Sequence, residues 1–196
     1  MGDAMYRQKR ILVTGSCEYE LLGLSRLLAG MGYEAVTAEM LPSGGYDCVL
    51  VALSAEPLAG WGRHLKCIRM LYAANPVPMV VLVPDRLKGM RLLGGTAHVI
   101  SGRNCLSRLR TMLWLAFKGM CGTESSGELT DLRKRTLISL RKAISSNASL
   151  KAASRKDYYL RACLVEYVGV ENLHVLCVSG LLSEMITDEP DSCFDM

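Results

Sequence analysis

The distribution of apolar residues divides the chain into two parts with different periodicities. In the first two thirds, short apolar bursts alternate with stretches in which apolar residues recur at helical spacing. The bursts predict buried strands of a parallel sheet at Ile11 to Val13, Cys48 to Leu53, Met79 to Val83 and Ala97 to Ile100. The helical stripes lie at Tyr19 to Leu28, Arg63 to Tyr72 and Leu106 to Phe117. This alternation predicts a doubly wound α/β domain.

The last third of the chain has a different pattern, because the strand signal largely disappears after Glu128. Its apolar residues are spaced as in a small helical bundle, with a candidate core of Leu137, Leu140, Leu160, Leu164, Val165 and Val168. The sequence GMCGTESSG, Gly119 to Gly127, has the composition of a linker between domains. We therefore predict an α/β domain at 1–118, a linker at 119–127, a helical domain at 128–186 and an acidic tail at 187–196.

The predicted fold also needs a strand before Glu39, second in chain order and its least secure element, and the connection from that strand to the one at Cys48 to Leu53 is unusually short. It is limited to Glu39 to Asp47, whereas a crossover between parallel strands normally takes about a dozen residues or more. We expect the helix of this crossover to be shortened or missing.

Composition narrows the class of protein. With 196 residues, 50% of them hydrophobic and 21% charged, the chain is globular. No apolar run approaches the roughly 18 residues of a membrane span, and the run after Met1 to Arg10 is too short for a signal peptide. We expect a cytoplasmic protein. Its eight cysteines include no Cys-x-x-Cys pair, which favours buried free thiols, and its three histidines lie too far apart to suggest a metal site.

Charge is segregated toward the end of the chain. Arg133 to Arg161 contains nine lysines or arginines and one acid, Asp157, whereas Thr187 to Met196 contains four acids and no base. A basic stretch is either a solvated helix face or a surface for nucleic acid. Charge alone does not separate these two interpretations.

The stretch from Ile11 to Gly119 resembles the receiver domains of two-component response regulators. The resemblance rests on the order of the strands, on Pro76-x-Pro78 before the fourth strand and on GLSRLL, Gly23 to Leu28. It implies a flavodoxin-like fold. Active receivers use an acidic pair after the first strand, a phosphoacceptor Asp after the third, a hydroxyl after the fourth and a lysine after the fifth.

This sequence departs from the receiver pattern at every chemical position. The resemblance places Gly15 and Ser16 at the acidic pair, Ala52 at the phosphoacceptor, Val83 or Pro84 at the hydroxyl and Gly102 at the lysine. Phosphoryl transfer needs a metal held by oxygen ligands together with these charges. The resemblance therefore implies a degenerate receiver that cannot be phosphorylated, although another kind of α/β domain remains an alternative.

The helical part resembles the LuxR or FixJ type of DNA-binding domain at both of its ends. At the beginning, Leu129, Thr130, Leu137 and Leu140 match the opening of the family's first helix. At the end, the family's Leu-Gly-Val-x-Asn turn is matched by Val168, Gly169, Val170 and Asn172. Between these anchors SSNASLKAAS lacks the family's Glu-Ile-Ala signature, so the supporting helix is expected to be short.

The resemblance implies a recognition helix at about Ser154 to Val168. Its N-terminal residues Arg155 and Lys156 are expected to face the major groove, while Tyr158, Tyr159 and Arg161 add contacts to the DNA backbone. The alternative is that the tyrosines pack inside a bundle and the basic residues only solvate it.

A receiver-like domain without a phosphorylation site, followed by a LuxR-type DNA-binding domain, is similar to the enterobacterial auxiliary regulators that control capsule or fimbriae. This similarity implies a transcription regulator whose partners are DNA and either a second copy or a response regulator. Because dimers of the family commonly use the last strand and helix of the receiver, the candidate interface is Leu106, Leu109, Leu113 and Trp114. A protein-interaction module that sequesters a partner regulator without contacting DNA is the alternative.

An enzymatic function has little support in the sequence. A strand followed by glycine in ILVTGS can begin a dinucleotide-binding turn, but the next glycine is Gly23, so the Gly-x-Gly-x-x-Gly spacing is absent. We find no Gly-x-Ser-x-Gly elbow or Ser, His and Asp grouping either. We therefore expect no catalytic activity, cofactor or metal.

Overall fold

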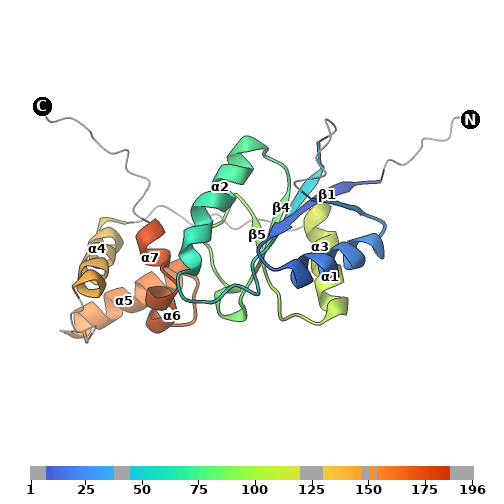
Figure 1. Cartoon of the computed structure of the whole chain (residues 1–196). Helices are drawn as coiled ribbons and strands as arrows, with labels where there is room; N and C mark the ends of the chain where they lie inside the picture. Colours follow the sequence, from blue (N-terminus) through green and yellow to red (C-terminus); the bar gives the residue numbers. More distant parts are fainter. Residues whose placement is uncertain (1–7, 38–44, 120–129, 147–150, 153, 186–196) are drawn as a thin grey trace, which may run out of the picture.

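The computed structural model describes residues 8–37, 45–119, 130–146, 151–152 and 154–185, which form an α/β part and a helical part (Figure 1). The α/β part contains, in chain order, β1 (Arg10–Gly15), α1 (Glu18–Ala29), β2 (Glu34–Val36), β3 (Cys48–Ala52), η2 (Trp61–Arg63), α2 (His64–Ala74), β4 (Met79–Val83), η3 (Asp85–Leu87), β5 (His98–Ser101) and α3 (Leu106–Phe117). The helical part contains α4 (Asp131–Ser145), α5 (Arg155–Val168), α6 (Leu173–Val178) and α7 (Leu181–Glu184). The four strands and three helices predicted for the first part are confirmed, with small differences at their ends.

The sheet is parallel throughout, with strand order β2-β1-β3-β4-β5. Its register places Gly15 beside Ala52 and Val83 beside Ser101, so the carboxyl ends of β1, β3, β4 and β5 share one edge. Residues 38–44, most of the predicted short crossover, lie outside the described residues, as do the linker residues 120–129 and the tail from 186.

Helices α1 and α3 cover one face of the sheet. Their inner stripes pack on Ile11, Val13, Leu50, Leu82 and Ile100, and contribute Leu24, Leu28, Leu109, Leu113, Ala116 and Phe117. This corrects the predicted dimer interface, because Leu109 and Leu113 are 6% and 0% exposed. Residues four apart share one face of a helix, and here that face is turned to the sheet.

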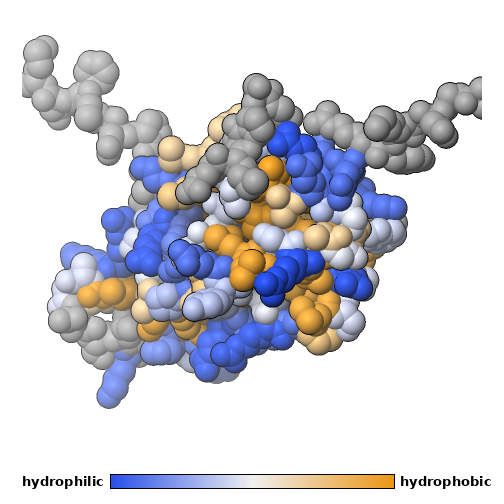
Figure 2. Space-filling view, turned by 45° about the vertical axis from the view of Figure 1, so that its right-hand side comes forward, coloured by the Kyte–Doolittle hydropathy of each residue, from blue (hydrophilic) through white to orange (hydrophobic). Residues whose placement is uncertain are grey.

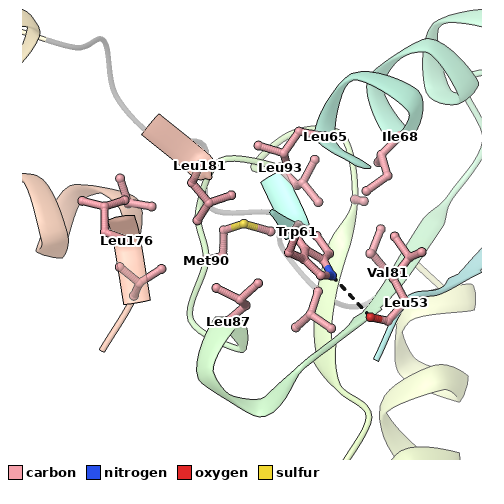
Figure 3. Close-up of a cluster of buried hydrophobic side chains, with 14 of the residues drawn as sticks. Leu53, Trp61, Leu65, Ile68, Val81, Leu87, Met90, Leu93, Leu176 and Leu181 are labelled. Carbon is pink, nitrogen blue, oxygen red and sulfur yellow. Dashed lines mark hydrogen bonds between the residues drawn. The ribbon is translucent and has the colours of Figure 1, made fainter. Parts of the chain in front are cut away.

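The other face of the sheet is covered by α2 and by the segment between β4 and β5. This segment forms the single turn η3 where a doubly wound fold commonly has a helix. Leu87, Met90 and Leu93 from this segment are buried against Trp61, which is itself fully buried. The Trp61 indole Nε1 donates a hydrogen bond to the Leu53 carbonyl at 3.3 Å, which satisfies its polar group in the core (Figure 3).

The same apolar cluster continues into the helical part. Figure 3 shows Leu176 of α6 and Leu181 of α7 facing Met90 and Leu87. The helical part contributes Leu137, Leu140, Leu164, Val168, Val170, Val175, Leu176, Leu181 and Leu182 to this cluster. The predicted bundle residues Leu137, Leu140, Leu164 and Val168 are thus buried, but their core is shared with the α/β part.

Backbone groups also cross between the two parts. The Gly62 N–H donates to the Ser179 carbonyl at 2.7 Å, and the Arg91 N–H donates to the Val168 carbonyl at 2.8 Å. A Cβ atom on Gly62 would lie 2.7 Å from the Gly180 carbonyl oxygen, and one on Gly89 would lie 2.7 Å from the Gly169 carbonyl oxygen. These glycines permit a backbone approach that any larger residue prevents.

The cysteines in the described ranges are free thiols, as predicted, but not all are buried. Cys48 is buried in β3, whereas Cys67 on α2 and Cys105 at the start of α3 are exposed. The expectation of buried thiols is wrong for these two, because Cys67 lies on the outer side of α2 and Cys105 precedes the first turn of α3 at the surface. In the same ranges, none of the helices has the length and apolar character needed to span a membrane.

We predict that Gly62→Ala lowers the free energy of unfolding by about 1–3 kcal/mol, because the added methyl group separates the two parts. Urea unfolding followed by circular dichroism measures the effect. The matched control is Gly23→Ala in α1, where a Cβ meets nothing within 4 Å, and there we expect a gain of up to about 1 kcal/mol. Unchanged stability of Gly62→Ala would contradict a closely fitted interface.

Candidate nucleic-acid interface and the sheet edge

Helix α5 has strong start and stop signals in the sequence. The Ser154 hydroxyl accepts a hydrogen bond from the Asp157 N–H at 3.1 Å and so caps the first turn. The helix ends at Gly169, which has a φ of 79°, and Asn172 then caps α6 by accepting from the Val175 N–H at 3.0 Å. Gly169 and Asn172, matched above to the Leu-Gly-Val-x-Asn turn, therefore stop one helix and start the next.

The N-terminal turns of α5 present the predicted DNA-contacting side chains to solvent. Arg155 and Lys156 are exposed, and Tyr158 and Tyr159 are 70% and 65% exposed. This end of α5 is the one farther from the sheet (Figure 1). A hydrogen bond with Cys163 raises the pKa of the Tyr159 phenol. The alternative in which these tyrosines fill a bundle core is wrong.

Arg161 differs from the other four predicted residues. Its guanidinium Nη2 lies 2.8 Å from Asp157 Oδ2, its Nε donates to Asp157 Oδ1 at 3.1 Å, and its side chain is only 12% exposed. Spacing of four residues on one helix explains the pair. Arg161 therefore neutralises the one acid in the first turn of α5, and the structure does not place it on the exposed surface.

Helix α4 is the described element that precedes α5. Lys151 and Ala152, in the stretch expected to hold a short supporting helix, are not helical, and residues 147–150 and 153 lie outside the described residues. The two helices pack together, and the Arg133 guanidinium lies over the Tyr167 ring at 5.0 Å from its centroid.

The five predicted degenerate positions come together at the carboxyl edge of the sheet. Gly15 pairs with Ala52, and the Gly102 N–H donates to the Val83 carbonyl at 3.0 Å. Ala52 and Val83 are fully buried apolar side chains. Ser16 carries a hydroxyl, which donates to Glu56 Oε1. The residues after the ends of parallel strands meet, as the topology requires.

Two of these positions are also closed sterically. A Cβ on Gly15 would overlap the Ala52 carbonyl oxygen, and a Cβ on Gly102 would overlap the Ser54 hydroxyl. Ser54 itself donates to Glu20 Oε1. The packing therefore leaves no room for an acidic side chain at 15 or a lysine at 102.

The carboxylates around this edge are held by groups of the same chain, which sequence reasoning missed. Hydrogen bonding from Ser16, followed by Arg63 and His64, lowers the pKa of Glu56. Ser101 Oγ donates to Asp85 Oδ1 at 2.8 Å, and this bond, followed by Lys88, lowers the pKa of Asp85. Within the described ranges, histidines, cysteines and acids form no group of three that could hold a metal.

A cavity of about 710 Å³ lies over the carboxyl edge. It is lined by Ser54, Glu56, Asp85 and Arg103 from the α/β part and by Glu171 from the helical part. The edge is thus enclosed partly by the second part of the chain.

No protein-family model matches the sequence, and no curated protein matches it significantly. Solved structures do match the fold. RcsB from Salmonella enterica serovar Typhimurium, bound to promoter P1flhDC with phosphomimetic BeF3⁻, is similar with a TM-score of 0.60 and 14% identity, over 91% of this chain and 99% of that one. A complex of the two-component response regulator RcsB with DNA gives a TM-score of 0.59 at 14% identity, over 90% and 98% of the two chains. A structure of two RcsB dimers bound to two parallel DNAs gives a TM-score of 0.58 at 14% identity, over 90% of this chain and 98% of that one. The likeness spans both parts, so this chain has the fold of full-length RcsB.

Proposed function

We propose that this protein is a transcription regulator that binds DNA through α5 and acts without phosphorylation. The observation that carries the proposal is the exposed group Arg155, Lys156, Tyr158 and Tyr159 on the first turns of α5. Cations and phenols at a helix N-terminus suit contacts with base edges and phosphates. The shared fold with RcsB, which is bound to DNA in the similar structures, supports the same conclusion.

The geometry of the sheet edge supports independence from phosphorylation. Ala52 offers no nucleophile, Gly15 offers no metal ligand, and the surrounding carboxylates are already hydrogen-bonded to Ser16, Ser54 and Ser101. Without an oxygen cage for Mg²⁺ and a nucleophile, phosphoryl transfer to this edge has no chemical route.

The docked arrangement of the two parts leaves the proposed DNA surface accessible. The α/β part holds the C-terminal end of α5, through the bond from Arg91 to Val168, while the exposed residues lie at the opposite end. DNA binding therefore needs no separation of the two parts. DNA binding would then be controlled by the concentration of the protein or by its pairing with a second regulator.

Pairing is part of the proposal, because one recognition helix reads one half-site. We propose that the protein forms a homodimer or a heterodimer with a response regulator, and that specific affinity depends on this pairing. Of the predicted interface residues, Leu106 is 71% exposed and Trp114 is 40% exposed, with Lys118 Nζ 4.2 Å from the Trp114 ring centroid. Figure 2, in which the α1 and α3 end is turned forward, shows separate apolar patches among hydrophilic side chains.

We predict that Arg155→Ala with Lys156→Ala abolishes regulation and specific DNA binding while the circular dichroism spectrum stays unchanged. Each base contact that is lost should cost roughly 1–3 kcal/mol. Binding is measured by gel shift on duplexes that the wild-type protein selects from a random-sequence pool.

The matched control removes one arginine and one lysine from the α/β part, Arg26→Ala with Lys66→Ala, both of which are exposed. This variant should bind like the wild type. Full regulation by the α5 variant would instead favour the model in which the protein sequesters a partner regulator without touching DNA.

We predict that acetyl phosphate with Mg²⁺ leaves the protein unmodified, because the nucleophile and the metal ligands are missing at Ala52, Gly15 and Ser16. Intact mass spectrometry measures the addition of a phosphoryl group. The variant Ala52→Asp should also stay unmodified, since Gly15 and Ser16 still supply no acidic pair for Mg²⁺. An acid-labile phosphate on the wild-type α/β part would refute the proposal.

We predict that Leu106→Glu with Trp114→Glu weakens self-association, or association with a partner response regulator, at least about tenfold by burying charge at the interface. Sedimentation equilibrium with and without the partner measures the change. Met70→Glu on α2, where Met70 is 62% exposed, is the control and should associate normally. Unchanged association of the double variant would place the interface elsewhere.

A further inference from the structure

Helix α4 has an inner face and an outer face of opposite character. Leu137 and Leu140 are buried in the shared cluster, together with Thr136. Every basic residue of α4 except Arg133 is exposed, namely Lys134, Arg135, Arg141 and Lys142. These four residues belong to the basic stretch Arg133 to Arg161, whose charge alone left open a solvated helix face or a surface for nucleic acid.

These four cations lack the local partners that neutralise other charges in the molecule. Arg161 pairs with Asp157, Arg63 with Glu56 and Lys88 with Asp85. Within the part of the chain that the structure describes, no side chain of the α4 set forms an ion pair. Adjacent like charges repel one another, so this face gains from a bound polyanion.

The spacing of the cations is regular along the helix. Lys134 and Arg141 are seven residues apart, as are Arg135 and Lys142, which places each pair in one row. Seven residues span about 10.5 Å at a rise of 1.5 Å per residue. A DNA strand carries one phosphate per about 3.4 Å of its axis, so two cations this far apart can contact different phosphates of one duplex.

The basic residues of α4 and of the first turn of α5 are neighbours in the sequence and lie on two helices that pack together. From Arg141 to Lys156 the sequence holds five basic residues and no acid. Helices α4 and α5 pack together, and both lie at the end of the molecule away from the sheet (Figure 1). The buried sides of both helices point to the shared cluster, which leaves their basic sides outward.

We propose that the outer face of α4 binds the phosphate backbone of DNA beside the site that α5 contacts. This inference rests on the proposed DNA-binding function and adds a second contacting element to it. Phosphate contacts position a protein on the duplex and carry no sequence information directly. Helix α4 therefore supplies affinity and salt dependence, whereas α5 supplies sequence preference.

The test uses the full chain and a fluorescein-labelled, mixed-sequence duplex of about 30 base pairs, with affinity measured by anisotropy between about 50 and 200 mM salt. The variants are Arg135→Gln with Lys142→Gln, and Lys134→Gln with Arg141→Gln. Glutamine keeps a good helix propensity, and circular dichroism checks the fold. The control is Arg26→Gln with Lys66→Gln, which removes the same charges from the α/β part.

Each lost phosphate contact should lower the slope of log affinity against log salt by about 0.9. For each α4 pair we expect the slope to be less steep than that of the wild type by about 1.8. The loss of affinity between about 50 and 200 mM salt should then be roughly tenfold smaller than for the wild type. The control pair should keep the wild-type slope. On duplexes selected by the wild type, the α4 variants should lose affinity for all sequences equally and keep their order of preference.

Failure of this inference is distinguishable from failure of the proposed function. A wild-type protein that binds no duplex, alone or with a partner regulator, would overturn both. Wild-type DNA binding with unchanged salt slopes in both α4 variants would overturn this inference alone. An equal loss of slope in the control pair would overturn it as well, by showing a diffuse charge effect. Normal DNA binding by an α4 variant that no longer regulates would overturn it in favour of a protein partner on this face.

Discussion

The structure depends on one apolar cluster that belongs to both parts of the chain. Val81 and Val83 of the sheet, Trp61 of η2 and Leu87 of η3 share it with Leu176 and Leu181 of the helical part. Contacts this close require glycine at position 62, which lies against Gly180, and on both sides where Gly89 meets Gly169. Because neither part encloses this cluster alone, the orientation of α5 is tied to the packing of the sheet.

The carboxyl edge of the sheet supports this packing with its polar residues. Asp85, fixed by Ser101 on β5, opens the turn that delivers Leu87 to the shared cluster. The bond from Ser101 lowers the pKa of this carboxyl, because a hydrogen bond to the charged form favours that form. Glu56 is fixed in a comparable way by Ser16 and Arg63. Polar residues at the carboxyl edge of the sheet thus hold neighbouring loops in place.

The shared apolar cluster also determines which sides of α4 and α5 are buried and which face solvent. Helix α5 is anchored at its C-terminal end by Arg91, and its basic N-terminal turns are directed away from the sheet. Helix α4 buries Leu137 and Leu140 in the cluster and exposes Lys134, Arg135, Arg141 and Lys142. One buried apolar contact therefore determines which charges of α4 and α5 face solvent.

The sequence by itself determined most of the sheet and its helices, because apolar runs located four of the five strands and apolar stripes located α1, α2 and α3. The resemblance to a DNA-binding family placed α5 at about Ser154 to Val168, where capping by Ser154 and the positive φ of Gly169 set its ends locally. Sequence spacing could not separate the exposed Leu106 and Trp114 from the buried Leu109 and Leu113. It also could not show that the Arg161 side chain pairs with Asp157. It also gave no sign of the Asp85 to Ser101 bond or of the glycine contacts between the two parts. Only the tertiary structure decided these, because burial and long-range hydrogen bonds depend on which residues distant in sequence become neighbours.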